Sequence, residues 1–263
     1  MAADSASIAN LALSHLGVYG KITNLTTDQT TEGKACRMFY ARSVSETLRQ
    51  APWQCAKKQV ALTLIGTNAD GTGLSGMAEW EYSYRLPEDC VMPLRILYAG
   101  NRNPNAQQEI PFALFADATS TDYDAATTYA AGDYARSVSI WYRALRTTIG
   151  DTPASSTSDW VAVTAPPKIL RTDVQYAVLE YTYDLTDTTR FDVDFESAVA
   201  CLLAYYIAPN ITVNGSMVDL RGQVAATYDL LVGQAKMNDY NARKRDLPPK
   251  SGYQTVRITG VRQ

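Results

Sequence analysis

Apolar residues recur at helical spacing in two segments near each end of the chain. The spacing predicts helices over residues 4–17 and 30–51, and again over residues 194–208 and from 216 to about 243. Asp4 and Ser216 are residue types that cap helix N-termini, and Pro52 and Pro209 stand where a helix would have to end. The two ends of the chain are therefore predicted to be helical.

The middle of the chain alternates apolar and polar residues with a period of two. Residues 59–65, 79–86, 94–98 and 175–181 are rich in β-favouring types and are predicted strands, with a turn between Pro87 and Pro93. The connections are too short for helical crossovers, so the strands are expected to be antiparallel.

This order of elements predicts an α+β protein. Because a helix with one apolar face must bury it, we expect a helical bundle formed by N- and C-terminal helix pairs, residues 1–53 and 190–247. A β-rich antiparallel domain, 54–117 and 166–189, is inserted into the bundle. A small all-β module, 118–165, is nested within that domain, and residues 248–263 form an extended C-terminal arm.

The arm begins with Pro248-Pro249, which stops the preceding helix and projects the chain outward. A strand-like alternation follows over Tyr253, Gln254, Thr255, Val256, Arg257 and Ile258. Such a strand either pairs with the chain's own sheet or adds to the edge of a neighbouring chain. We predict that these six residues add to the edge of a neighbouring chain.

Residues 118–165 carry an aromatic set of their own. The members are Tyr123, Tyr129, Tyr134, Trp141, Tyr142 and Trp160, with turns at Gly132-Asp133 and Gly150-Asp151-Thr152-Pro153. Their order resembles the small carbohydrate-binding modules appended to chitinases, over less than a fifth of the chain. The resemblance implies exposed aromatic side chains that stack on sugars, and we predict that Tyr123, Tyr134 and Trp141 have this role. Tyr129, Tyr142 and Trp160 are expected to form the module's core.

Charge and cysteine content narrow the function classes. The 263 residues include 24 Lys and Arg and 27 Asp and Glu, which gives a formal charge of -3. This charge disfavours non-specific electrostatic binding to nucleic acid. The basic run Arg243-Lys244-Arg245 complements the helix dipole or, as an alternative, forms a nucleic-acid patch. No run of residues is apolar and long enough to cross a membrane.

Cys36, Cys55, Cys90 and Cys201 form no C-x-x-C pair, so we expect reduced, buried thiols and neither a metal site nor a cofactor.

Catalytic signatures are missing from the sequence. His15 is the only histidine and lies on an apolar helical stripe, which favours a packing role over catalysis. No nucleophile elbow, phosphate-binding loop or metalloprotease motif occurs. Carboxylate chemistry remains open, with Asp122, Asp124 and Asp133 close to the aromatic set. We predict that the chain is not an enzyme.

Three stretches outside the module follow a known pattern. They are Pro52-Trp53-x-x-Ala56, Tyr82-x-Tyr84-x-Leu86-Pro87-x-Asp89-Cys90, and Phe195-x-x-Ala198-x-x-x-x-Leu203-Ala204-x-x-Ile207 before a long helix. The pattern is similar to the head-to-tail adaptor proteins of tailed bacteriophages, the tail tubular protein A family, over nearly the whole chain apart from the aromatic insert.

This resemblance implies a structural protein of the virion neck, assembled in the host cytoplasm. Its partners would be the portal protein, the tail nozzle protein and further copies of itself in a ring, commonly of twelve, with genomic DNA passing through without sequence-specific binding and no membrane contact. The arm with its residues Tyr253 to Ile258 would bind the portal protein or an adjacent subunit. The alternative is a carbohydrate-binding or glycan-degrading virion protein acting through the aromatic insert. A DNA-binding protein using Arg243-Lys244-Arg245 is the third hypothesis.

Overall fold

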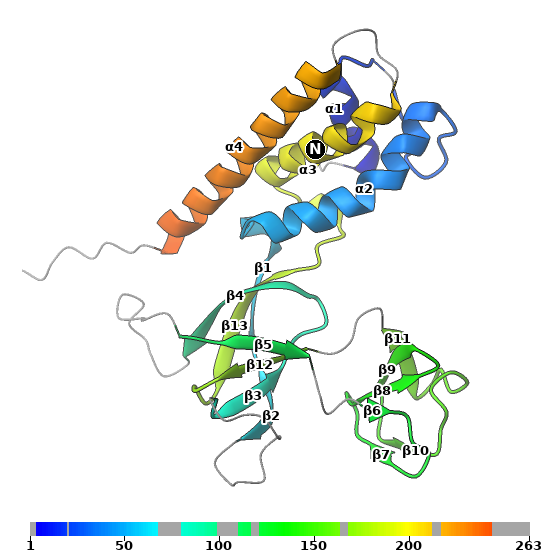
Figure 1. The fold of residues 1–263 in the computed structure, drawn as a ribbon, viewed down its shortest axis with the longest axis vertical. Helices are drawn as coiled ribbons and strands as arrows, with labels where there is room; N and C mark the ends of the chain where they lie inside the picture. The colour runs from blue at the N-terminus through cyan, green and yellow to red at the C-terminus, as the bar shows by residue number, and fades with distance from the viewer. Residues whose placement is uncertain are drawn as a thin grey trace, which may run out of the picture.

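The four predicted helical segments are helical in the structure, a computed structural model that describes residues 4–19, 21–67, 80–98, 110–116, 121–163, 168–211 and 217–243. The α-helices are α1 (Ser5–His15), α2 (Thr31–Gln50), α3 (Val193–Ile207) and α4 (Met217–Arg243). Short 3-10 turns are η1 (Gln54–Ala56), η3 (Thr188–Arg190) and η4 (Ala208–Asn210). In Figure 1 the α-helices gather at one end of the molecule, and α4 runs along their outside.

Thirteen strands among the described residues form four separate sheets. The strands are β1 (Lys57–Ala61), β2 (Thr63–Thr67), β3 (Tyr82–Arg85), β4 (Cys90–Tyr98), β5 (Ala113–Ala116), β6 (Thr121–Asp122), β7 (Thr128–Tyr129), β8 (Tyr134–Ser137), β9 (Ile140–Ala144), β10 (Thr148–Ile149), β11 (Trp160–Val163), β12 (Lys168–Thr172) and β13 (Ala177–Tyr183). The strand orders are β1-β13-β4, β2-β3-β12-β5, β11-β9-β8-β6 and β10-β7. All pairings are antiparallel except that of β6 with β8.

Side-chain caps fix where three of the helices begin. The carboxylate of Asp4 accepts from the backbone N–H of Ser7 at 2.7 Å, as its position before α1 predicts. Thr30 caps α2 and Asp192 caps α3 by equivalent bonds. These bonds satisfy N–H groups that the first turn of a helix leaves free.

One hydrophobic core joins the helices to the β1-β13-β4 and β2-β3-β12-β5 sheets. Trp53, which follows α2, and Phe195 in α3 are both buried, and their rings meet edge to face with centroids 5.2 Å apart. The indole N–H of Trp53 donates to the carbonyl of Thr47 at 2.7 Å. Tyr84 from β3 and Leu179 from β13 belong to the same core. Helical and sheet segments therefore stabilise one another.

This arrangement contradicts the predicted class, an α+β protein built on a helical bundle of N- and C-terminal helix pairs. The chain is a mixed α/β protein whose strands are distributed over four sheets. Its helices are not packed pair against pair, because α3 is the central helix and contacts α1, α2 and α4. The prediction failed because an apolar stripe shows that a helix face must be buried but not which element covers it.

Several strand predictions also need correction. The predicted strand over 59–65 is two strands, β1 and β2, which separate at Leu62 and enter different sheets. The predicted turn between Pro87 and Pro93 ends earlier, because β4 begins at Cys90 and runs through Pro93. A proline is tolerated there because β4 lies at the edge of its sheet, where its pairing with β13 is irregular. Strands β5 and β12 were not predicted.

Some sequence-based predictions fall outside the described residues. They include the whole arm from 248 to 263, with Tyr253, Gln254, Thr255, Val256, Arg257 and Ile258, and also Lys244 and Arg245 of the basic run. The residue ranges assigned to the domains stay a prediction. Within the described part of the chain, no helix combines the length and apolarity that a membrane crossing requires.

Candidate functional site

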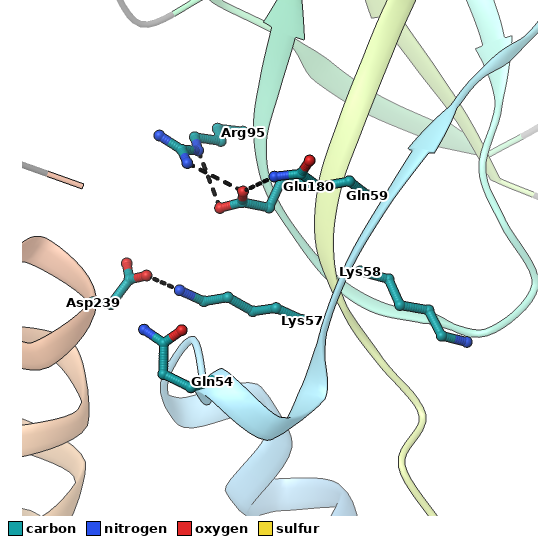
Figure 2. A pocket seen from close by; sticks show the side chains of 7 residues that line it. All are labelled: Gln54, Lys57, Lys58, Gln59, Arg95, Glu180 and Asp239. Carbon is teal, nitrogen blue, oxygen red and sulfur yellow. Dashed lines mark hydrogen bonds and ion pairs between the residues drawn. The ribbon is translucent and has the colours of Figure 1, made fainter. Parts of the chain in front are cut away.

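A polar cavity of 470 Å³ lies where the β1-β13-β4 sheet meets the C-terminal half of α4. Figure 2 shows the seven side chains that line it: Gln54, Lys57, Lys58, Gln59, Arg95, Glu180 and Asp239. They come from η1, three strands and one helix that are far apart in the sequence. The cavity is therefore a product of the tertiary fold.

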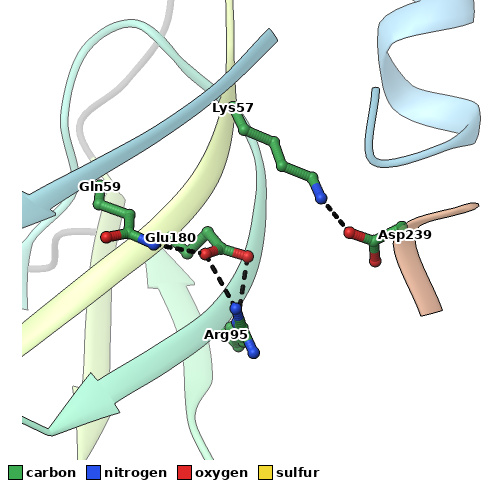
Figure 3. A network of polar contacts seen from close by, with 5 residues as sticks. All are labelled: Lys57, Gln59, Arg95, Glu180 and Asp239. Carbon is green, nitrogen blue, oxygen red and sulfur yellow. Dashed lines mark hydrogen bonds and ion pairs between the residues drawn. The ribbon is translucent and has the colours of Figure 1, made fainter. Parts of the chain in front are cut away.

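Gln59, Glu180 and Arg95 form a row across the three strands of this sheet. Glu180 is directly opposite Gln59 on β1 and Arg95 on β4. The two carboxylate oxygens of Glu180 accept from Nε and Nη2 of Arg95 at 3.0 and 3.1 Å, and one also accepts from the amide of Gln59 at 2.7 Å (Figure 3). Burial alone would raise the pKa of Glu180, but these hydrogen bonds and the charges of Arg95 and Lys57 outweigh it, so the pKa lies below its ordinary value.

Two lysines at the start of β1 point to opposite sides of the sheet. Lys57 forms an ion pair with Asp239 near the end of α4, and only 16% of the lysine side chain and 6% of the aspartate side chain are exposed. Lys58 points away from Asp239, pairs with Asp89 at 2.7 Å, and lies 3.9 Å from the centre of the Tyr183 ring. The Lys57–Asp239 ion pair, which we call the inner pair, therefore fixes the end of α4 to the sheet.

The chemistry available in this cavity is binding and positioning. Its three cations, Lys57, Lys58 and Arg95, are each engaged by a carboxylate. The lining holds neither a histidine, a cysteine nor a hydroxyl nucleophile. The arrangement couples α4 to the sheet by charge pairs, because its two carboxylates, Glu180 and Asp239, are themselves engaged by Arg95 and Lys57.

The sequence pattern does not predict this cluster. The contacts join residues separated by 121, 85 and 182 positions, for Gln59–Glu180, Arg95–Glu180 and Lys57–Asp239. One signal was present: Glu180 interrupts the otherwise apolar strand from Ala177 to Tyr181, and a carboxylate in such a place requires a partner. The sequence could not show which cation supplies it.

A second polar cluster holds the aromatic module against the β2-β3-β12-β5 sheet. Arg85 of β3 donates from Nη1 to the carbonyl of Gly132 at 2.5 Å and lies 5.3 Å from the Tyr134 ring centre. The Tyr134 hydroxyl donates to Glu88 at 2.9 Å, and Arg143 forms an ion pair with Glu88 at 2.5 Å. Burial, then the bond to Glu88, raises the pKa of Tyr134 to about 12.

The structure places the three nominated glycan-contact residues in different environments. Tyr134 is only 9% exposed, so its assignment as an exposed sugar contact is wrong: it docks the module. Tyr123 is partly buried, stacks on Tyr129 with centroids 5.7 Å apart and packs against the module core. Trp141 is half-buried on β9, opposite Arg136 of β8 and Val163 of β11.

The predicted core of the module is largely confirmed. Tyr129 and Trp160 are buried, with ring centroids 5.1 Å apart, and Tyr142 is partly buried against the same cluster. The indole N–H of Trp160 donates to the carbonyl of Asp151 at 2.8 Å. A module this small needs such large side chains to build a core.

The nearby carboxylates have structural partners. Asp124 accepts from the backbone N–H of Ala126 at 3.0 Å, and Asp133 accepts from that of Ala130 at 2.8 Å. Asp122 faces Arg136 at 3.5 Å. Two of the three therefore shape turns.

His15 lies beside a buried thiol. Its Nε2 is 3.8 Å from Sγ of Cys201, and burial lowers the pKa of His15 while raising that of Cys201. Both shifts favour the neutral forms, which is the opposite of an activated thiolate–imidazolium pair. This environment agrees with a packing role for His15.

The four cysteines are free thiols, as the sequence predicts. Cys36 and Cys201 are buried, whereas Cys55 and Cys90 are only partly so. Burial raises the pKa of Cys36, Cys55 and Cys90 to about 12. Nowhere in the described ranges do three His, Cys, Asp or Glu side chains converge as a metal site would need.

A search against models of known protein families gave no match, and a search of curated protein sequences gave none either.

Proposed function

We propose that this chain is a structural protein of the virion neck of a tailed bacteriophage. It would be one subunit of the head-to-tail adaptor ring that joins the portal protein to the tail nozzle protein. Genomic DNA would pass through the ring without sequence-specific binding. The net charge of -3 fits a passage that does not hold DNA.

The packing of the three motif stretches supports this proposal. Each stretch that resembles the adaptor family contributes buried side chains to the same core. Examples are Trp53 and Ala56 from the first, Tyr84 and Leu86 from the second, and Phe195 and Leu203 from the third. The resemblance therefore rests on residues that pack together at the junction of helices and sheets, as a shared scaffold requires.

The test is assembly on a portal ring from the phage that encodes this chain. We expect the purified protein to comigrate with the portal and native mass spectrometry to show several adaptor copies per portal ring. Absence of any complex would overturn the proposal.

The same assay tests the arm. Deletion of residues 248–263, or the pair Val256→Asp and Ile258→Asp, is expected to abolish docking, with Thr255→Ala as the control on the opposite face of the predicted strand. Circular dichroism of each variant verifies that the remainder is folded. Docking that survives the deletion would remove the arm from the binding surface.

The alternative function is carbohydrate binding by the module, and Trp141 supports it. Trp141, Arg136 and Asp122 occupy neighbouring register positions across β9, β8 and β6. This row sets a half-buried indole beside two exposed charged groups, and sugar recognition combines such an apolar surface with a few polar groups.

Affinity electrophoresis with chitin oligosaccharides and bacterial surface glycans separates the two functions. Under the carbohydrate alternative, Trp141→Ala removes retardation, whereas Tyr19→Ala, a change at a fully exposed aromatic outside the module, leaves it intact. No retardation of the native protein would exclude this alternative for the glycans tested. Hydrolysis lost on changing Asp122 would show an enzyme instead.

A further inference from the structure

Helix α4 carries two apolar stripes on opposite faces. The first contains Val224, Val232 and Ala235, which are buried in the core, and α4 packs against α3. The second contains Ala226, Leu230, Gly233, Met237 and Tyr240, all of them exposed. Residues of the second stripe follow those of the first by about two positions, a rotation of about 200° around a helix. A helix that is apolar on both faces is built to pack between two elements.

The second stripe, which we call the outer seam, has the spacing of a helix–helix contact. Its residues are separated by four, three, four and three positions, which is the repeat of the contact positions in a coiled coil. Leu230, Met237 and Tyr240 are 68%, 60% and 62% exposed. A Cβ atom added at Gly233 would meet no atom within 4 Å, so the middle of the seam is open.

We propose that the outer seam binds the outer seam of a second copy of this chain, with the two α4 helices antiparallel. In the register that pairs Leu230 with Gly233 of the second copy, Ala226 meets Met237 of the second copy. Symmetry repeats both contacts, so four successive layers each set one large side chain against one small one. This complementarity lets the helices approach closely without steric overlap.

The charges beside the seam select the same register. Asp229 and Lys236 precede Leu230 and Met237 by one residue, and both are exposed. In an antiparallel pair these flanking positions face each other, so Asp229 of each copy meets Lys236 of the other. Neither residue forms an ion pair with another described residue of its own chain. A parallel pair would instead place Asp229 near Gln234 and leave the charges unmatched.

This two-fold contact does not depend on the proposed function. A closed ring is built from heterologous contacts, whereas the seam is self-complementary and makes a dimer. The dimer would therefore exist before or outside ring assembly. From Ala226 to Tyr240 the seam is about 21 Å long, which makes a small interface and a weak dimer.

The experiment is sedimentation velocity on the full chain over a concentration series from about 10 μM to about 1 mM. We expect the dimer fraction to rise with concentration. Leu230→Glu should abolish the dimer, and Met38→Glu should not, since Met38 is an equally exposed apolar residue on α2. Both sites are exposed, so circular dichroism should show native folding of both variants.

Charge reversal tests the register. Asp229→Lys alone and Lys236→Asp alone each replace two attractions by two repulsions and should weaken the dimer at least about fivefold. The double variant restores both attractions and should recover the native dissociation constant. A protein that stays monomeric, a dimer that tolerates Leu230→Glu, or a double variant that is not rescued would each overturn the proposal. Failure to form a portal complex would overturn the proposed function but leave the dimer unaffected.

Discussion

Lys57 and Asp239 are 182 positions apart in the sequence, and their side chains form a largely buried ion pair. Lys57 begins β1 directly after η1, whereas Asp239 lies in the last turns of α4. The pair therefore ties the segment that leaves the N-terminal helices to the last helix described. The outer seam of α4 is held in place by the same contact.

Removing one member of this pair should destabilise the protein strongly. Asp239→Leu leaves the Lys57 ammonium buried without its carboxylate, and the loss of one partner from a buried pair costs about 3–5 kcal/mol. We expect the free energy of unfolding, measured by urea titration, to fall by an amount near this range. The double variant with Lys57→Met should recover part of the loss, because no unpaired charge remains.

Lys58→Met is the matched control for that experiment. It removes a neighbouring lysine whose pair with Asp89 is exposed, with 44% and 38% of the two side chains accessible. Exposed pairs contribute about 1 kcal/mol or less. Equal losses for Lys57→Met and Lys58→Met would show that burial of the inner pair has no energetic consequence.

Glu180 should make stability depend on acid pH. Hydrogen bonds from Arg95 and Gln59 hold its pKa below the ordinary 4.5 in the folded state, against the effect of burial. The unfolded chain therefore binds the proton first as pH falls, so the stabilisation is complete above about pH 4.5 and is lost as pH falls through the folded-state pKa. Glu180→Gln should lose about 1–3 kcal/mol at pH 7. That difference from the native protein should shrink below pH 4.5.

Gln59→Ala separates the charge from the hydrogen bond. This variant keeps the carboxylate and its contact with Arg95, so it should be less stable at pH 7 yet retain an acid-dependent decrease. Urea titrations between pH 7 and pH 3 supply the measurement. A difference between native protein and Glu180→Gln that stays constant over this range would refute the assigned pKa direction.

Trp53 should be the most sensitive aromatic residue of the core. Trp53→Ala removes a fully buried ring that meets Phe195 and should cost about 3–5 kcal/mol. Trp53→Phe retains an aromatic ring but loses the hydrogen bond to the Thr47 carbonyl, which should lower the free energy of unfolding by about 1–2 kcal/mol. Thermal unfolding measures these losses. Trp141→Phe, a change at a half-buried tryptophan, is the control. A larger loss at Trp141 than at Trp53 would contradict the assigned core.

Local patterns predicted the helices well because each helix depends on neighbouring residues. Asp4, Thr30 and Asp192 are capping residues that bond within three positions, and Pro52 stops α2 by its own backbone chemistry. The strands were harder. Leu62 separates two strands of different sheets, yet the alternation of apolar and polar residues around it predicts a single strand.

The polar clusters could not be predicted because their partners are distant in the sequence. Tyr134 was assigned to the surface on the basis of its place in an aromatic series. Its environment is set by Arg85 and Glu88, which lie 40 to 50 positions earlier. The sequence shows that an aromatic residue has a flat apolar face, but only the fold shows whether that face meets solvent.

The contact between Tyr134 and Glu88 should stabilise the docked module, and it should do so less at high pH. Tyr134→Phe removes the hydroxyl that donates to Glu88 and should cost about 1–2 kcal/mol at pH 8. In the folded protein the pKa of Tyr134 is raised to about 12, whereas an unfolded tyrosine ionises near its ordinary 10. Above pH 10 the folded state thus binds more protons than the unfolded one, and stability falls as pH rises toward 12.

Tyr134→Phe should accordingly show a shallower alkaline decrease in the free energy of unfolding than the native protein. Urea titrations from pH 8 to about pH 11 measure the difference. Tyr176→Phe, a change at a tyrosine that is 71% exposed, is the control and should follow the native curve. Glu88→Gln should lower stability at pH 8 through the same contact, because it weakens the bond to Tyr134 and the ion pair with Arg143 together. If Tyr134→Phe and Tyr176→Phe behave alike across this range, then the contact of Tyr134 with Glu88 does not stabilise the docked module.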